Sequence, residues 1–179
     1  MSSLKLPEIR GWIDDTLNTH KAQARPVRSY EFKRLPLFYS AKLLRETQVV
    51  EVARVPVPPL TRMGFPEFAE FENGDHDGIT YRSTYFIKSN QVSEESLHLH
   101  ELVHVLQWQH LDVDRFLMAY AVGYLKAHGY RWNPLETMAY DIQAYFCHGG
   151  SPIDLEPVVR RLLDALRPSL LGVNSESEP

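Results

Sequence analysis

The sequence predicts a mostly helical α+β fold in which a small β-sheet precedes the longest helices. Apolar residues recur at spacings of three and four over most of the chain, as they do in helices that bury one face. Residues 49–55 and 79–87 are instead rich in β-branched and aromatic side chains, which favour strands. Both stretches lie before residue 93, and helical spacing dominates after it. The sheet is therefore expected to come before the helices of the second half.

The N-terminal part of the chain, residues 1–77, begins with a predicted helix. One apolar stripe at helical spacing consists of Leu6, Ile9, Ile13 and Leu17. Pro7 suits the first turn of a helix, because a proline at that position loses no hydrogen bond. We therefore expect a helix from Pro7 to about His20.

A second helix, a strand and a loop are expected to follow. Ser40 is a suitable N-cap for a helix over 40–48. The valines of 49–55 indicate a strand, which Pro56 ends. Residues 60–77 are acidic and contain turn dipeptides, so we expect an irregular loop there.

Residues 78–147 are expected to form the core, which consists of one strand and three helices. The strand covers 79–87. Ser93 is expected to cap a helix that ends near His110. The next helix is expected over 113–128. Apolar residues occupy nearly every face of this helix, which indicates that it is buried.

Two further helices complete the predicted fold. Asn133-Pro134 opens a helix that reaches about Cys147. The C-terminal segment 148–171 is expected to hold one amphipathic helix, over 152–166. Residues 172–179 are polar, and we expect them to be a flexible tail.

Length and composition predict one globular domain over 1–179, without a nucleic-acid or membrane partner. The 179 residues suffice to bury a core, and 44% apolar and 23% charged residues are ordinary globular values. A net charge of -4 gives no sign of a nucleic-acid partner, and no apolar run is long enough to span a membrane. The lone Cys147 and the lack of a secretory signal in 1–10 fit a cytoplasmic protein, whose oligomeric state stays open.

The motif His100-Glu101-Leu102-Val103-His104 is the strongest functional signal. Residues four apart project from the same face of a helix, so His100 and His104 can bind one metal ion. Zinc accepts two such nitrogens and leaves room for a carboxylate and a water. Glu101 projects about 100° away from His100, where it can take a proton from that water without binding the metal. These residues predict zinc-dependent hydrolysis.

The sequence offers three candidates for the third protein ligand. Glu136 lies at the start of a predicted helix, which holds a ligand rigidly. His110 has the spacing of the metzincin pattern, but Gln107 stands where that pattern has the glycine that lets the chain turn back. Asp141 lies later on the same helix as Glu136. Glu136 is the candidate that we prefer, and the other two remain open at this point.

With these residues in place, the chain resembles the gluzincin clan of zinc metallopeptidases, in particular its small single-domain members. The resemblance covers about residues 78–145 and rests on Gly78-Ile79-Thr80-Tyr81, Tyr85-Phe86-Ile87, the helix segment from Leu97 to Gln107, and Asn133-Pro134-Leu135-Glu136-x-x-Ala139. It implies a zincin-like domain with a zinc ion on His100, His104 and Glu136, and with Glu101 as the general base. It also implies that the strand over 80–87 pairs with the extended backbone of a peptide or protein substrate.

Tyr140 completes the list of candidate catalytic residues. It lies one turn after Glu136 on the same helix face, so its hydroxyl could donate to the oxyanion of a tetrahedral intermediate. Packing against the ligands is the alternative that we favour. In several gluzincins an aspartate four residues after the ligand glutamate supports a metal histidine, and here Tyr140 takes that place.

The predicted function is therefore that of a zinc metallopeptidase, and three alternatives are kept. The first is a non-catalytic zinc-binding module that works through the acidic segment 67–77, although such a module has no need for Glu101. The second is a metzincin-like protease with His110 as the third ligand. The third is a toxin-like or self-processing protease that acts on one protein.

Overall fold

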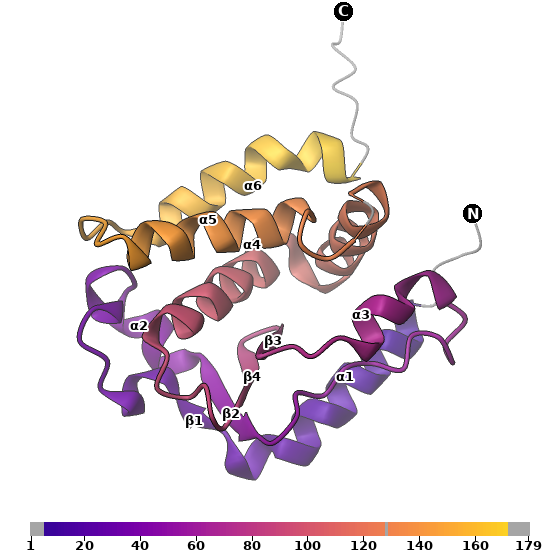
Figure 1. The fold of residues 1–179 in the computed structure, drawn as a ribbon, viewed down its shortest axis with the longest axis horizontal. Helices are drawn as coiled ribbons and strands as arrows, with labels where there is room; N and C mark the ends of the chain where they lie inside the picture. The colour runs from indigo at the N-terminus through magenta and orange to yellow at the C-terminus, as the bar shows by residue number, and fades with distance from the viewer. Residues whose placement is uncertain (1–5, 128, 172–179) are drawn as a thin grey trace, which may run out of the picture.

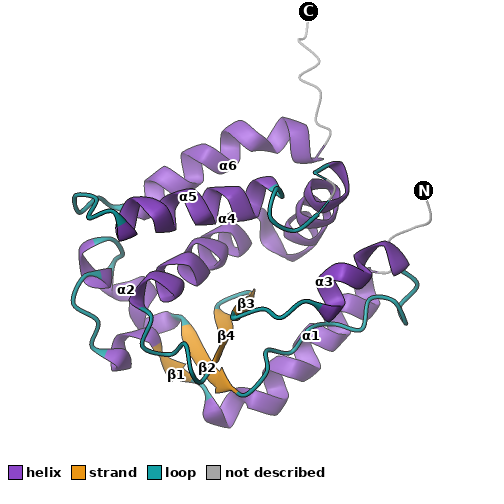
Figure 2. Cartoon of the chain, viewed as in Figure 1, coloured by secondary structure: helices purple, strands orange, loops and turns teal. Residues whose placement is uncertain are grey.

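The computed structural model describes residues 6–127 and 129–171, and it confirms a mostly helical α+β fold with a small sheet (Figure 1). Figure 2 shows the sheet and the N-terminal helix at one side of the molecule, with the three helices that follow residue 94 grouped on the other. The segment 172–179, which we predicted to be a flexible tail, lies outside the described residues.

The sheet has four short strands in the order β1-β2-β4-β3. These are β1 (Arg25–Pro26), β2 (Gln48–Val52), β3 (Gly78–Tyr81) and β4 (Thr84–Lys88). Strands β2 and β4 are parallel, whereas β1 and β3 pair antiparallel to their neighbours. Strand β3 therefore forms a free edge of the sheet.

The single strand that we predicted over 79–87 is wrong, because this segment is a β-hairpin. The turn consists of Arg82 and Ser83, and Arg82 adopts a left-handed conformation with φ 58°. Glycine or asparagine usually marks such a turn in the sequence. Arg82 and Ser83 carry no such signal, so the sequence pattern continues unbroken through the turn.

The other elements before β3 are helices and helical turns. They are α1 (Leu6–His20), α2 (Ala41–Glu46), α3 (Ala69–Asn73) and the 3-10 turns η1 (Lys21–Gln23), η2 (Val27–Tyr30), η3 (Leu35–Leu37) and η4 (Pro66–Phe68). The prediction that Ser40 caps the second helix is confirmed, since its hydroxyl accepts a hydrogen bond from the backbone N–H of Leu43 at 3.1 Å. The segment 60–77 is not wholly irregular as expected, because η4 and α3 lie within it.

Helix α4 (Glu95–Lys126) contains both helices that we predicted over 93–110 and 113–128. They meet at a kink at Asp112, whose backbone leaves the helical region with φ 61° and ψ 176°. The carboxylate of Asp112 accepts a hydrogen bond from the backbone N–H of Arg115 at 3.1 Å, which caps the second half. The predicted N-cap Ser93 is wrong by one residue, because Glu94 occupies that position and Ser93 lies in the preceding turn.

Helices α5 (Pro134–Cys147) and α6 (Leu155–Leu171) pack against α4 (Figure 1). Asn133 caps α5 by accepting a hydrogen bond from the N–H of Leu135, as its position predicted. Helix α6 begins three residues later and ends later than expected. Among the described residues, no helix is both long and apolar enough to cross a membrane.

The core of the molecule surrounds the first half of α4. The sheet and α1 lie on one side of this helix, and α5 and α6 lie on the other (Figure 1). Every residue from 98 to 108 is therefore buried, polar side chains included. A buried polar side chain costs free energy unless it has partners, so the polar residues of this segment must satisfy one another.

Candidate metal centre

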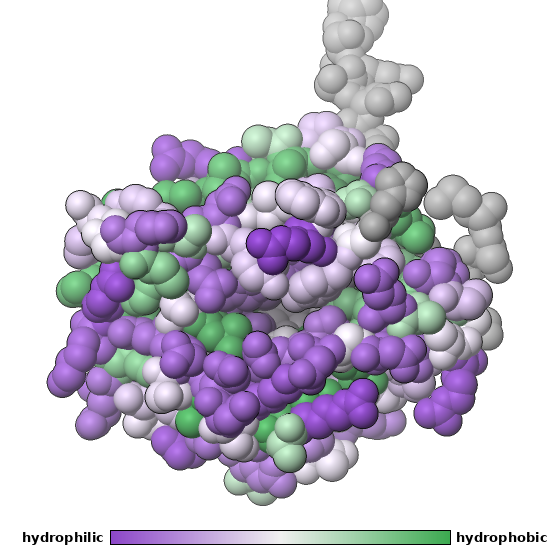
Figure 3. Space-filling model, viewed as in Figure 1, coloured by the Kyte–Doolittle hydropathy of each residue, from purple (hydrophilic) through white to green (hydrophobic). Residues whose placement is uncertain are grey.

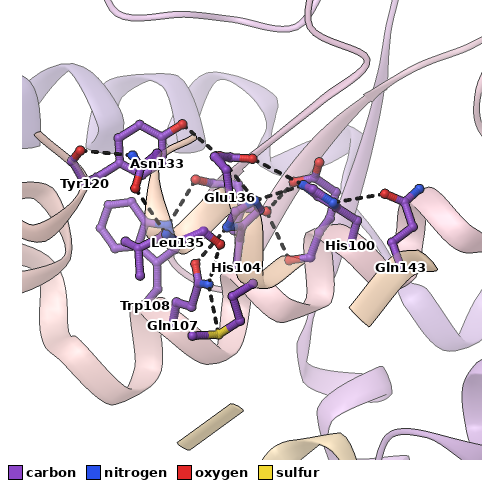
Figure 4. A network of polar contacts seen from close by, with 12 residues as sticks. His100, His104, Gln107, Trp108, Tyr120, Asn133, Leu135, Glu136 and Gln143 are labelled. Carbon is purple, nitrogen blue, oxygen red and sulfur yellow. Dashed lines mark hydrogen bonds and ion pairs between the residues drawn. The ribbon is translucent and has the colours of Figure 1, made fainter. Parts of the chain in front are cut away.

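The structure brings His100, His104 and Glu136 together at the contact between α4 and α5 (Figure 4). The two histidines lie one turn apart on the buried half of α4, and Glu136 lies in the first turn of α5. One ligand atom from each residue lies within 4.8 Å of the other two. All three side chains are buried, with relative exposures of 3%, 6% and 2%.

The three side chains lie close enough together to share one zinc ion, with each histidine facing a different oxygen of Glu136. The two Nε2 atoms of His100 and His104 lie 3.1 Å apart. Each is 3.5 Å from an oxygen of Glu136, His100 from Oε2 and His104 from Oε1. Ligand atoms at 2.0–2.1 Å from a tetrahedral zinc ion are about 3.3 Å apart. The residues therefore fit the metal without a rearrangement of the backbone.

Two glutamines fix which nitrogen of each histidine faces the centre. The Nδ1–H of His104 donates to Oε1 of Gln107 at 2.8 Å, and the Nδ1–H of His100 donates to Oε1 of Gln143 at 3.1 Å. The orientation of the Gln107 amide is fixed in turn, because its NH₂ group donates to the backbone carbonyl of Leu135 at 2.9 Å. Both Nε2 atoms therefore face the same point, which either a metal ion or a proton shared between the two nitrogens can occupy.

The electrostatics of Glu136 favour a positive charge at the same point. Burial alone would raise the pKa of Glu136, but the neighbouring His104 and His100 hold it well below its usual range. Its Oε1 accepts a hydrogen bond from the hydroxyl of Tyr120 at 2.7 Å, whereas its buried Oε2 has no hydrogen-bond partner. For His104 the effects are reversed. Burial alone would lower its pKa, but the nearby Glu136 carboxylate outweighs burial and raises the pKa of His104 to about 9. The buried carboxylate thus favours a positive charge at this point, which either a protonated His104 or a bound metal ion can supply.

Glu101 lies beside the cluster and is not one of its three members. The hydroxyl of Thr80 donates to its Oε2 at 2.6 Å, which leaves Oε1 as the oxygen able to accept a proton. A Cβ atom at Gly78 would collide with the Glu101 carboxylate, so a larger residue at this position of β3 would displace that side chain. Burial raises the pKa of Glu101, although His104 and His100 act in the opposite direction.

The two alternative third ligands lie outside the cluster. The Nε2 of His110 is 2.8 Å from the carboxylate of Asp164 on α6, on an outer side of the protein. The helix continues through Gln107, so the chain does not turn back as the metzincin pattern requires. Asp141 is exposed on α5 and is not part of the cluster.

Tyr140 packs against the candidate ligand His100. Its ring lies edge-on to the ring of His100, with centroids 4.6 Å apart. The guanidinium of Arg131 lies over the other part of the Tyr140 ring, 5.4 Å from its centroid. This contact is compatible with the packing role that we favoured from the sequence, and the oxyanion role of Tyr140 stays a prediction.

The residues that support the centre are those that sequence reasoning missed. Gln107 is three residues after His104 and could have been found by helical spacing alone. Gln143, Tyr120 and Thr80 come from other elements, and their positions depend on how α5, the second half of α4 and β3 pack. No local pattern identifies these three residues.

A large apolar cavity opens beside the metal centre. It holds about 910 Å³ of empty space, with open solvent at its mouth included, and Glu101, His104 and Glu136 form part of its lining. Helix α1, the segment 58–71 and the second half of α4 supply its other walls. Figure 3 shows this face of the molecule hollowed near its centre.

Comparison of the chain with protein-family models, with curated proteins and with solved structures gives no match.

Proposed function

We propose that the protein is a zinc metallopeptidase in which His100, His104 and Glu136 hold the metal and Glu101 is the general base. The observation that carries the proposal is the joint orientation of two Nε2 lone pairs and one carboxylate toward a single point, with a second carboxylate beside it. A structural zinc site is closed by four protein ligands, whereas a catalytic site keeps one position open. Three protein ligands beside an open cavity support the catalytic kind.

The chemistry divides between the metal and Glu101. A zinc ion, when bound, supplies a Lewis acid that lowers the pKa of a coordinated water toward ~7. Oε1 of Glu101 accepts the proton of the attacking water while Thr80 holds Oε2 in place. The same oxygen then returns the proton to the nitrogen of the leaving amine. Burial helps Glu101 to take the proton, because it raises the pKa of this carboxylate.

The edge of β3 offers a place for the substrate backbone. Lys88 donates its N–H to the carbonyl of Asp77 at 2.9 Å, and hydrogen-bonded pairs alternate along an antiparallel ladder. Gly78 and Thr80 therefore direct their N–H and C=O groups away from β4, toward the free edge. An extended peptide that adds to this edge would lie next to Glu101, which touches both residues.

The test is a comparison of Glu101→Gln with Glu94→Gln. Both substitutions replace a carboxylate by an amide on the same helix, but Glu94 lies exposed at the helix start. Each protein is loaded with one zinc ion, which elemental analysis verifies, and is then incubated with a peptide library. We expect Glu101→Gln to keep zinc and lose at least ~100-fold in the rate of hydrolysis, with no loss in Glu94→Gln.

Two results would contradict the proposal. Zinc content that is the same after both His100 and His104 are replaced by alanine would rule out the metal centre. Zinc-loaded wild-type protein that cleaves no peptide would rule out the peptidase and favour the non-catalytic zinc-binding module.

A further inference from the structure

We propose that the cavity beside the metal centre binds one large uncharged apolar side chain of the substrate, of the size of phenylalanine or leucine, next to the bond that is cleaved. This inference rests on the proposed function, because it takes the metal centre as the place of the reaction. It assigns a role to the apolar side chains of α1 and of the segment 58–71, for which the sequence predicted none.

The cavity and the metal centre are one continuous space. Glu101, His104 and Glu136 belong to both the metal centre and the lining of the cavity. A group that fills the cavity is therefore next to whatever reacts at the metal. For a peptide substrate, that group is the side chain of a residue that flanks the scissile bond.

The walls of the cavity select for an apolar group. They consist mainly of Leu6, Ile9, Ile13, Pro58, Leu60, Phe65, Phe68, Phe71, Trp108, Phe116, Leu117 and Ala121. The carboxylates in the lining belong to the metal centre, and His76 is engaged by the backbone carbonyl of Phe71 at 2.7 Å. A charged side chain would lose its hydration here without gaining a partner, so the cavity disfavours it.

The edge strand β3 can contribute little to substrate recognition, so most of it falls to this cavity. The indole N–H of Trp108 donates to the carbonyl of Thr80 at 3.1 Å, so one of the outward-facing carbonyls of β3 is already engaged. Pairing with a substrate backbone is thus confined to Gly78 and to the N–H of Thr80. Backbone pairing also does not distinguish one substrate side chain from another, whereas an apolar cavity selects the side chain that fills it.

Ala121 allows the cavity to be closed without touching the metal centre. Its side chain lines the cavity from the second half of α4, and Val122, its neighbour, is not among the lining residues. A phenylalanine at Ala121 would occupy the space that we assign to the substrate. Val122→Phe makes a similar increase in size outside the cavity and is the matched control, and Leu117→Trp is a second filling variant.

The test measures binding of two metal-directed probes to the zinc-loaded full chain. The probes are N-acetylphenylalanine hydroxamate and N-acetylglycine hydroxamate, which differ only in a benzyl group, and their Kd values are measured by calorimetry. We expect the benzyl probe to bind about 10- to 100-fold more tightly to the wild-type protein and to Val122→Phe. Ala121→Phe and Leu117→Trp should reduce this preference to about threefold or less. Equal binding of both probes to the wild-type protein would overturn the inference.

Cleavage of a peptide library separates this inference from the proposed function. Cuts that fall beside phenylalanine, leucine or methionine in the wild-type protein, and lose that preference in Ala121→Phe, support both. Cuts without any apolar preference overturn the inference and leave the peptidase intact. A benzyl preference in binding without hydrolysis of any peptide supports the cavity assignment and refutes the peptidase.

Discussion

Replacing Gln107 by leucine should weaken both the metal centre and the fold. Gln107 is fully buried, and its amide joins the Nδ1–H of His104 to the carbonyl of Leu135. Leucine has a similar volume but no polar atoms, so it leaves the Nδ1–H of His104 buried without a partner, whereas the Leu135 carbonyl keeps its hydrogen bond within α5. An unsatisfied buried donor costs about 1–3 kcal/mol, so the free energy of unfolding should fall by about that amount. The ring of His104 also loses its orienting partner, which should cost about 10- to 100-fold in zinc affinity.

The matched comparison is Gln143→Leu on α5. Gln143 holds His100 through the same kind of hydrogen bond, at 3.1 Å, but its side chain is only partly buried. Water can therefore take the place of the lost amide oxygen, and a water-mediated hydrogen bond is nearly as favourable as a direct one. We expect Gln143→Leu to lose less zinc affinity and less stability than Gln107→Leu.

Two measurements check this comparison. Competition with a chromophoric chelator gives the zinc affinity of each variant, and urea unfolding in excess chelator gives the stability without metal. Wild-type zinc affinity in Gln107→Leu, or a larger loss in Gln143→Leu, would show that the glutamines do not orient the ligands.

Three further predictions follow from the same geometry. A strong chelator should lower the stability of the zinc-loaded protein by about 3–4 kcal/mol at zinc concentrations of 100 to 1,000 times the Kd, a shift of roughly 6–16 °C in the Tm. An unchanged Tm after zinc release would refute the coupling between metal and fold. Glu136→Gln should weaken zinc binding by orders of magnitude in a chelator titration, whereas His110→Gln should bind as the wild-type protein does, and the reverse ranking would restore the metzincin-like alternative. Gly78→Ala should displace Glu101 and reduce hydrolysis at constant zinc content, while Gly11→Ala, whose Cβ meets no atom within 4 Å, should keep full activity and gain about 0.5–1 kcal/mol in helix stability. Equal activity in these two alanine variants would contradict the tight fit at Gly78.

The sequence alone determined the features that depend on neighbours within one or two helical turns. The spacing of His100 and His104 puts their rings on one face of any helix that contains them. Ser40 and Asn133 cap their helices through hydrogen bonds to residues two or three positions away. Each of these features depends on local backbone geometry, which the residue types themselves restrict.

The predictions that were wrong depend on contacts with the rest of the chain. The segment 79–87 reads as one strand, but β4 pairs with β2 from a distant part of the sequence, and a turn at Arg82 returns β3 along its other edge. Local preference does not distinguish these outcomes, because both conformations satisfy it.

Only the tertiary structure decided which carboxylate or imidazole joins the histidine pair. Glu136 reaches the pair because α5 packs against α4, and the same packing leaves His110 beside Asp164 on α6. Tyr120 meets Glu136 only because the second half of α4 changes direction at the kink. The apolar cavity, built from segments more than a hundred residues apart, has no counterpart in any local pattern. The physical reason is that a helix fixes its own side chains, whereas the approach of two elements depends on the apolar surface that all the others bury.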